Sequence, residues 1–312
     1  MKNTERSACL PNGAPFASPL PDWGLIHATG ADAQGFLHGQ FTNDLLALRP
    51  DGAQWNGYCS AKGRLYAAFL VWRDSGDGFY LAAERALLPG LVKRLRMFVL
   101  RAKVVLEDVS EAFRIQGLVG PDLPAPMAVA RKAPLTLVGL PPVHGVARGL
   151  AVSGKEAAFD SGLAPGSADD WQRLMIHAGE VWITPATQEQ FVPQMVNLDA
   201  IGAINFKKGC YPGQEIVARA HYRGAVKRRA YLAHVEGAAK AGDPLFAADP
   251  GRSDGGQESG LVANAAPAPG GGSDVLAVVQ IQSHAQAQIH LGAADGSLLH
   301  FAELPYAIPA AA

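Results

Sequence analysis

One segment holds the densest group of reactive and charged side chains in the chain: Lys207-Lys208-Gly209-Cys210-Tyr211-Pro212-Gly213-Gln214-Glu215, followed by Ile216-Val217-Ala218-Arg219-Ala220-His221-Tyr222-Arg223-Gly224. Pro212 and Gly213 are typical of the centre of a type II turn, because proline presets φ and glycine supplies the positive φ required next. Such a turn would hold Cys210 and Glu215 close together. The apolar run 216–218 that follows predicts a strand.

The cysteine of this segment is the first candidate for chemistry. Lys207 and Lys208 precede Cys210, and nearby positive charges favour the thiolate form of a cysteine. The thiol is therefore a candidate nucleophile, redox group or single metal ligand. The alternative is a structural cysteine whose side chain only packs in the turn. A Cys–His hydrolase using His177 or His221 stays open, because the sequence gives no pairing geometry.

A run of basic residues is the second candidate. Glu215 is the one acidic residue in a span that holds seven basic residues and three tyrosines: Lys207, Lys208, Arg219, Arg223, Lys227, Arg228 and Arg229, with Tyr211, Tyr222 and Tyr231. This combination suits phosphate, RNA or a polyanionic ligand such as a glutamate tail. The alternative is a solvated strand edge that its charges protect from pairing.

The composition is that of a folded protein with little net charge. The chain has 312 residues, of which 48% are hydrophobic and 18% are charged. This length predicts roughly two domains with a substantial core. Because the net charge is −1, nucleic-acid contact would need a local basic patch.

The cysteine count limits metal chemistry. Cys9, Cys59 and Cys210 are far apart and form no Cys-x-x-Cys pair, which argues against a disulfide framework and against a self-contained zinc or iron–sulfur site. We therefore expect no resident metal. The N-terminus lacks the apolar core of a signal peptide, and no apolar run approaches the ~20 residues of a membrane span. We expect a cytoplasmic protein without membrane contact.

The order of predicted elements indicates an α+β fold rather than a doubly wound parallel sheet, because strands paired by tight turns alternate with few helices. We expect a loosely held leader at 1–20, an α+β region at 21–229 and an all-β domain at 230–312. Helices are predicted at 31–39, 45–48, 86–100 and 171–177, the last capped by Asp169 or Asp170. Predicted strands cover 24–29, 55–61, 65–72, 79–82, 104–106, 113–115, 231–235, 260–263, 275–281 and 289–291. Residues 121–142 are weakly patterned, and no helix or strand is predicted there.

Two tryptophans are candidates for binding a flat ligand. Trp23 and Trp171 each follow an aspartate and stand just before an apolar run. The face of an indole ring stacks well against a flat heterocycle. Core packing is the alternative for each of them.

Residues 207–215, together with Arg219 and 222–224, resemble the KGCYxGQE signature of the YgfZ family. Residues 207–224 are called the signature segment below. These are folate-binding proteins related to the aminomethyltransferase (T protein) of the glycine cleavage system. The resemblance covers nearly the whole chain, and its other parts are Asp22-Trp23, 30–32, 39–40, 42–44, Cys59 with 62–64, 191–194, 197–198 and 304–306.

The resemblance implies three lobes around a central folate channel, two of them interleaved in the α+β region 21–229 and the third a C-terminal β-barrel. It also implies tetrahydrofolate or a derivative as the cofactor. It places Trp23 and Trp171 at folate-contacting positions, and the set of folate-binding residues that we expect is Trp23, Trp171, His177, Tyr211, Arg219 and Arg223. It implies that Cys210 is the functional thiol, a candidate transient metal ligand, with Lys208 and Glu215 tuning or positioning it. The implied role is support of iron–sulfur enzymes and, through radical enzymes of that kind, of tRNA thiolation.

Two departures from the aminomethyltransferases shape the functional prediction. Ala67 and Ala68 stand where the acidic pair of those enzymes should fall. His177 replaces a carboxylate, and an imidazole cannot reproduce the paired acceptors of a carboxylate. We therefore predict a monomeric accessory protein without classical catalysis. The alternatives are a folate-dependent one-carbon transferase and a factor that contacts tRNA directly.

Overall fold

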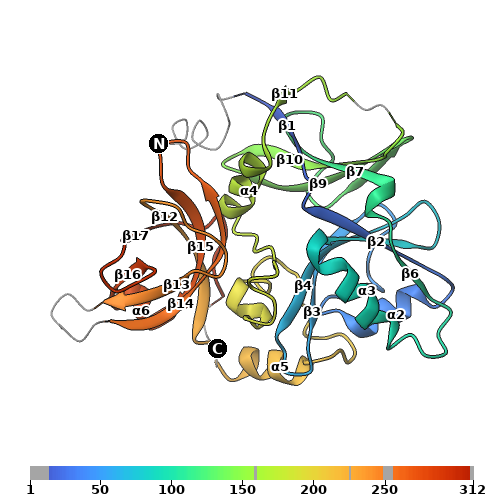
Figure 1. The fold of residues 1–312 in the computed structure, drawn as a ribbon. Coiled ribbons are helices and arrows are strands. Elements are labelled where there is room, and N and C mark those ends of the chain that lie inside the picture. The colour runs from blue at the N-terminus through green and yellow to red at the C-terminus, as the bar shows by residue number, and fades with distance from the viewer. Residues whose placement is uncertain (1–13, 158–159, 225, 249–255, 310–312) are drawn as a thin grey trace.

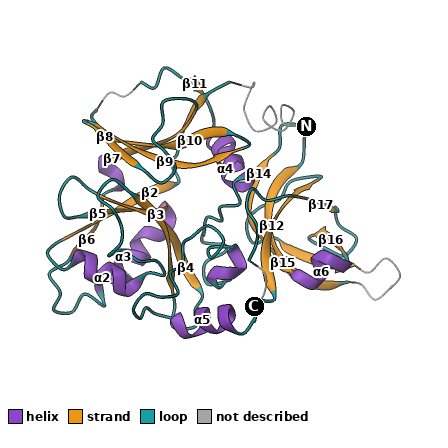
Figure 2. Cartoon of the chain, turned by 180° about the vertical axis from the view of Figure 1, so that it is seen from behind, coloured by secondary structure: helices purple, strands orange, loops and turns teal. Residues whose placement is uncertain are grey.

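The computed structural model describes residues 14–157, 160–224, 226–248 and 256–309, and its strands form three sheets, one in each of three lobes (Figure 1). Figure 2 shows from behind that helices are few and lie mostly outside the sheets. The predicted α+β class is confirmed. Every helix in the described part of the chain is too short or too polar to cross a bilayer.

The sheet of the first lobe is antiparallel, with the order β3-β4-β5-β2-β6. Its strands are β2 (Trp23–Thr29), β3 (Ala53–Cys59), β4 (Leu65–Arg73), β5 (Phe79–Glu84) and β6 (Val105–Asp108). The helices of this lobe are α2 (Ala33–Gln40), η2 (Arg85–Leu87) and α3 (Leu88–Arg96). In the register of the sheet, Trp23 lies opposite Glu84, which brings an indole and a carboxyl to the same end of the lobe.

The second lobe is built on a sheet with the order β11-β1-β7-β10-β9-β8. Its elements are β1 (Phe16–Pro19), η3 (Ser110–Ala112), β7 (Phe113–Val119), β8 (Val129–Lys132), β9 (Leu135–Val143), β10 (Val146–Gly154), β11 (Ala164–Pro165) and α4 (Ala168–His177). Helix α4 packs closely on this sheet at Gly117, where a Cβ would lie 2.2 Å from the ring of Trp171. The absence of a side chain at Gly117 therefore lets Trp171 approach the sheet.

The third lobe is a curled antiparallel sheet with the order β16-β13-β14-β15-β12-β17. Its elements are β12 (Arg228–Val235), β13 (Pro244–Ala248), β14 (Gln257–Pro267), β15 (Ser273–Gln280), α6 (Ile281–Gln286), β16 (Gln288–Leu291) and β17 (Leu299–Ala302). A single bridge between His290 and Leu298 brings its two edges together. The predicted C-terminal barrel is therefore confirmed as a half-barrel, in which the curled sheet encloses its own apolar cluster.

The strand predicted at 216–218 is wrong. These residues lie in α5 (Gln214–Tyr222), which begins after Gly213 at φ 78°. Val217 and Ala220, three residues apart, are the buried positions of this helix, so the apolar residues follow a helical period that a three-residue run cannot reveal. The structure therefore places the signature cysteine just before a helix.

Three further predictions differ from the structure. Residues 16–19 of the expected leader form β1, with Phe16 buried. The prediction missed this strand because its alternation of buried and exposed residues is only four residues long. Residues 1–13 of the expected leader lie outside the described residues. The helix expected at 45–48 is a turn, because the Asp44 carboxylate accepts hydrogen bonds from the N–H groups of Leu46 and Ala47. The weakly patterned span 121–142 contains β8 and most of β9.

Candidate functional site

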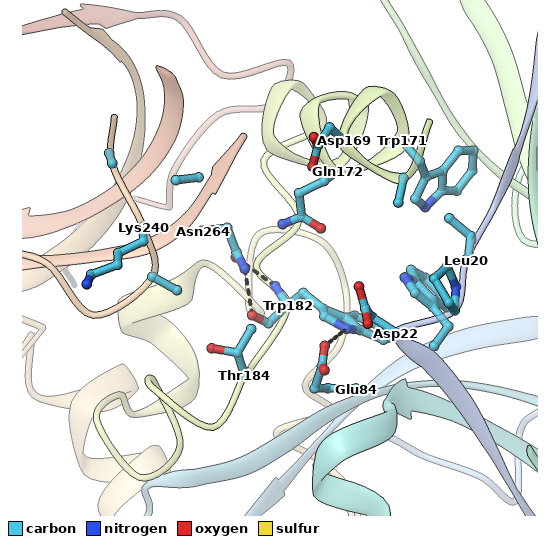
Figure 3. Close-up of a pocket in the computed structure, with 16 residues that line it drawn as sticks. Leu20, Asp22, Glu84, Asp169, Trp171, Gln172, Trp182, Thr184, Lys240 and Asn264 are labelled. Carbon is cyan, nitrogen blue, oxygen red and sulfur yellow. Dashed lines mark hydrogen bonds between the residues drawn. The ribbon is translucent and has the colours of Figure 1, made fainter. Parts of the chain in front are cut away.

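A pocket of about 330 Å³ lies where the three lobes meet (Figure 3). The first lobe supplies the turn before β2 and the end of β5, the second supplies α4, and the third supplies β14 and the loop 239–241. The lining residues are Leu20, Pro21, Asp22, Trp23, Glu84, Ala168, Asp169, Trp171, Gln172, Trp182, Thr184, Ala239, Lys240, Ala241, Asn264 and Ala265. Two of the predicted folate-binding residues, Trp23 and Trp171, are therefore in the wall of one pocket.

A pair of stacked indoles forms one wall of this pocket. The rings of Trp23 and Trp182 are stacked with their centroids 4.0 Å apart and an interplanar angle of 18°. Asn264 fixes Trp182 from the third lobe, because its side chain accepts from the backbone N–H of Trp182 at 2.9 Å and donates to the backbone carbonyl of Trp182 at 2.8 Å. The aromatic wall is therefore held rigidly across a lobe boundary.

Trp171 carries a donor without a partner. Its side chain is 1% exposed, and its indole Nε1 has no hydrogen-bond partner among the described residues. Buried tryptophan N–H groups usually find a partner. The orphaned N–H in the pocket wall is thus a position at which a ligand acceptor would be stabilised.

Glu84 brings a carboxyl group to the same pocket. It accepts a hydrogen bond from Trp182 Nε1 at 3.2 Å. Burial, with the negative charge of Asp22, raises the pKa of Glu84 to about 7, although hydrogen bonds from Trp182 and from the backbone of Ala86 oppose the rise. Near neutral pH the carboxyl group therefore exists in both protonation states.

Sequence reasoning missed Trp182, Glu84 and Asn264. Each comes from a different segment, and only the meeting of the lobes makes them neighbours. The apolar run 181–183 containing Trp182, just after the end of α4, was the available signal for a third pocket tryptophan. No comparable signal marks Glu84 or Asn264.

His177 lies outside the lining of the pocket, at the end of α4. Its Nε2 is 2.9 Å from the Asp274 carboxylate, which His234 also contacts at 3.0 Å. Burial alone would raise the pKa of Asp274, but hydrogen bonds from these two histidines hold it below its usual value. The contact connects α4 of the second lobe with β15 and β12 of the third.

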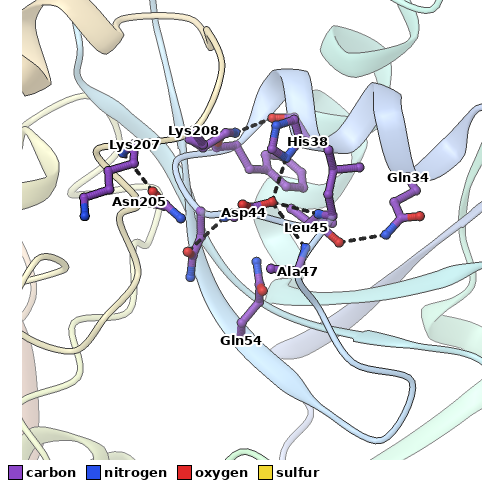
Figure 4. Close-up of polar contacts among 12 residues, drawn as sticks. Gln34, His38, Asp44, Leu45, Ala47, Gln54, Asn205, Lys207 and Lys208 are labelled. Carbon is purple, nitrogen blue, oxygen red and sulfur yellow. Dashed lines mark hydrogen bonds and ion pairs between the residues drawn. The ribbon is translucent and has the colours of Figure 1, made fainter.

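Lys208 anchors the signature segment to the first lobe (Figure 4). The residue is 9% exposed, and its ammonium donates hydrogen bonds to the carbonyls of His38 and Phe41 at the end of α2. Burial lowers the pKa of Lys208 to about 8, opposed by the negative charge of Asp44. Its Nζ also lies 5.1 Å from the ring centroid of the buried Tyr211, whose pKa burial raises.

Cys210 is an exposed free thiol, whereas Cys59 is buried. The turn after Cys210 packs tightly, because a Cβ on Gly213 would lie 2.4 Å from the Ser60 carbonyl oxygen and 2.6 Å from the Cα of Gly63. Within the described residues, no group of three or more His, Cys, Asp or Glu side chains is placed to hold a metal ion.

The charged residues after Cys210 lie on the surface of α5. Glu215, Arg219 and Arg223 are exposed, and a distance of 4.0 Å separates Arg219 Nη2 from Glu215 Oε1. His221, by contrast, is stacked on Phe206 with a centroid separation of 3.7 Å.

The structure thus divides the predicted site residues into separate groups. Trp23 and Trp171 line the pocket at the lobe junction, whereas none of the predicted residues of the signature segment is in its lining: Lys208, Cys210, Tyr211, Glu215, Arg219 and Arg223. Figure 1 shows α5 at the lower end of the molecule and α4 in its upper half. The candidate folate site and the candidate thiol site are therefore distinct.

The three sheets of this chain meet at the pocket. The structure is similar to that of aminomethyltransferase T from Bartonella henselae, with a TM-score of 0.66, 14% identity, and coverage of 96% of this chain and 88% of the other. The predicted three-lobed fold is confirmed by this similarity.

The sequence has closer relatives. The chain is 33% identical over 231 residues to the tRNA-modifying protein YgfZ of Shigella dysenteriae and to that of Escherichia coli O157:H7, covering 68% of this chain and 70% of each relative. No protein-family model matches it. The chain belongs to the YgfZ family, which confirms the resemblance found in the signature segment.

Proposed function

We propose that this protein is a folate-binding accessory factor for tRNA modification, acting as a monomer in the cytoplasm. The observation that carries the proposal is the pocket at the lobe junction, with its stacked indoles and the unpartnered Nε1 of Trp171. The name of the relatives, tRNA-modifying protein, supports the biological role.

The pocket suits tetrahydrofolate or a derivative. Its volume of about 330 Å³ lies within the range of small-molecule sites. A pterin ring would lie against an outer face of the stacked pair of Trp23 and Trp182, since their inner faces contact each other. The Trp171 N–H would donate to a carbonyl oxygen or ring nitrogen. Lys240, which Figure 3 shows on the side of the pocket opposite Trp171, would meet the anionic glutamate tail. Bound tetrahydrofolate would supply a carrier of one-carbon units.

We propose that binding occurs without one-carbon transfer. Ala67 and Ala68 are buried in β4 and offer no carboxylate to a reacting folate nitrogen. A transferase needs such a charge near the atoms that change charge in the transition state. Formation of methylenetetrahydrofolate from an aminomethyl donor would instead support the transferase alternative.

We propose that Cys210 serves iron–sulfur client enzymes, as a reactive thiol or as a transient ligand of their clusters. Its exposure on a loop fixed by Lys208 and by the tight turn at Gly213 supports this role, because a client must reach the sulfur. Lys208 is then a positioning residue.

The folate proposal is tested by isothermal titration of the protein with tetrahydrofolate. The expected result is saturable binding at one site that weakens strongly in Trp23→Ala, because one face of the stacked wall is removed. Absence of saturable binding to the wild-type protein would overturn the proposal.

The thiol proposal is tested in cells lacking the native protein. Wild type should restore the activity of iron–sulfur enzymes that modify tRNA, and Cys210→Ala should not. Full restoration by Cys210→Ala would remove the thiol from the account while leaving folate binding intact.

Direct contact with tRNA is a second candidate function, which the exposed surface of α5 favours. Arg219 and Arg223 lie on it beside Tyr222, which is 65% exposed. Exposed cations with an aromatic ring can bind phosphates and stack on a base. A gel shift with tRNA that is unchanged by joint substitution of both arginines would exclude this surface.

A further inference from the structure

Glu84 places an acidic group among the aromatic side chains of the junction pocket. It ends β5, opposite Trp23, and accepts from the indole N–H of Trp182. Its carboxyl is thus bonded to one member of the stacked pair, and its backbone lies opposite the other in the sheet. Most of the remaining lining is apolar, aromatic or neutral, so a carboxyl at this position has a strong influence on which ligand edge is accepted.

The other polar groups near the indole wall have defined roles. The amide of Asn264 is occupied at both ends by the backbone of Trp182. Trp171 Nε1 is an unpartnered donor. Among the pocket carboxyls, Glu84 is the one that is hydrogen-bonded to the indole wall, and Trp171 Nε1 is a donor without a protein partner.

We propose, on the basis of the folate function proposed above, that Glu84 is the residue that recognises the N–H-bearing edge of the pterin ring, with Trp171 Nε1 donating to an acceptor on the same ligand. The 2-amino-4-oxo edge of a pterin carries an amino group and a ring N–H next to a carbonyl oxygen. A carboxylate accepts from adjacent N–H groups, and such charge-assisted bonds are the stronger kind. Glu84 thereby supplies from β5 a carboxylate that α4 lacks at His177, where the side chain instead contacts Asp274.

Other charged groups lie around Glu84, and the binding of a ligand to its carboxyl should depend on pH. Asp22 and Asp169 also line the pocket and disfavour a further negative charge, while Lys240, another lining residue, favours one. Arg85, the next residue, pairs with Glu111. A ligand edge that donates two N–H groups binds the ionised carboxylate better than the neutral acid, whose O–H is itself a donor. Because the pKa of Glu84 is about 7, the affinity for such a ligand should rise with pH. Between pH 6 and 8 the ionised fraction, and with it the affinity, increases about tenfold.

The test measures binding of tetrahydrofolate, kept reduced, at pH 6, 7 and 8 to wild type, Glu84→Gln and Glu107→Gln. Glu107 is an exposed glutamate in β6 of the same sheet, outside the lining of the pocket, and serves as the matched control. Wild type and Glu107→Gln should gain about tenfold in affinity from pH 6 to 8. Glu84→Gln should lose this pH dependence and bind more weakly at pH 8.

A second ligand separates recognition of the ring from recognition of the tail. p-Aminobenzoylglutamate, which lacks the pterin, should bind wild type and Glu84→Gln equally. A thermal melt checks that Glu84→Gln is folded. Its melting temperature relative to wild type should rise from pH 5 to pH 8, because burial of the ionised carboxylate destabilises the wild type.

Each outcome is decisive. If Glu84→Gln binds tetrahydrofolate with the affinity and pH profile of wild type, Glu84 does not recognise the ring, although the pocket remains a folate site. If it loses affinity equally for tetrahydrofolate and for p-aminobenzoylglutamate, the role of Glu84 is general to the pocket, and recognition of the pterin edge is overturned. If wild type binds no tetrahydrofolate, the proposed function fails and this inference fails with it.

Discussion

Lys208 and Lys207 are adjacent lysines with different surroundings. Lys207 is exposed, whereas Lys208 is buried with its ammonium on the carbonyls of His38 and Phe41. The last carbonyls of a helix lack partners within the helix, and a cation near them is favourable. The Lys208 side chain thus stabilises the end of α2 and fixes the loop that carries Cys210.

Substitution of the two lysines should have unequal effects on stability. Lys208→Met should lower the free energy of unfolding by about 2 kcal/mol, because two carbonyls lose a charged donor. Lys207→Met, at an exposed position, should change it by less than about 0.5 kcal/mol. Urea unfolding measures both, and equal stability of the two variants would show that Lys208 does not anchor the loop.

The element that the sequence described least well is α5. The signature motif marked the segment correctly, but the apolar triplet 216–218 suggested a strand, because three residues cannot distinguish a period of 2 from one of 3.6. What determines the helix is Gly213, whose positive φ and close approach to Gly63 allow the chain to turn into α5. Sequence alone gave the turn but not the surface against which it packs.

Two glycines of this segment provide a matched test. Gly213→Ala should destabilise the protein by about 3 kcal/mol, because a Cβ would overlap the Ser60 carbonyl at a backbone conformation that disfavours side chains. Gly209→Ala should be nearly neutral, since its Cβ would meet only His38 Nε2 at 3.9 Å. Chemical denaturation compares the two, and a neutral Gly213→Ala would contradict the packing of this turn.

At the scale of the whole molecule, the three lobes create a site that no single lobe contains. Trp23 and Trp171 were predictable as binding residues, and the structure brings both to one pocket. Trp182, Glu84 and Asn264 could not be assigned, because their proximity depends on how the lobes dock. His177 was expected at the folate, but it contacts Asp274 across a lobe boundary and lies outside the lining of the pocket.

The Asp274 contacts should make lobe docking sensitive to acid. The pKa of Asp274 is below its usual value, so the stability it contributes is present above about pH 4 and is lost as the pH falls through its folded-state pKa. Asp274→Asn should cost about 3 kcal/mol at pH 7, and this cost should decrease as the pH falls through the folded-state pKa of Asp274. Asp295→Asn, at an exposed position of the same lobe, is the control. A pH-independent cost for Asp274→Asn in urea unfolding would contradict this account.

The most direct measurement is fluorescence titration with tetrahydrofolate of wild type, Trp171→Phe and Trp72→Phe. Trp72 is a buried tryptophan of β4 outside the lining of the pocket, so its variant controls for loss of a core indole. We predict saturable quenching in wild type and Trp72→Phe, with affinity about threefold to tenfold weaker in Trp171→Phe because the indole N–H donor is lost. The absence of saturable quenching in wild type, or equal affinity in all three proteins, would contradict the assignment of this pocket as a folate site built around Trp171.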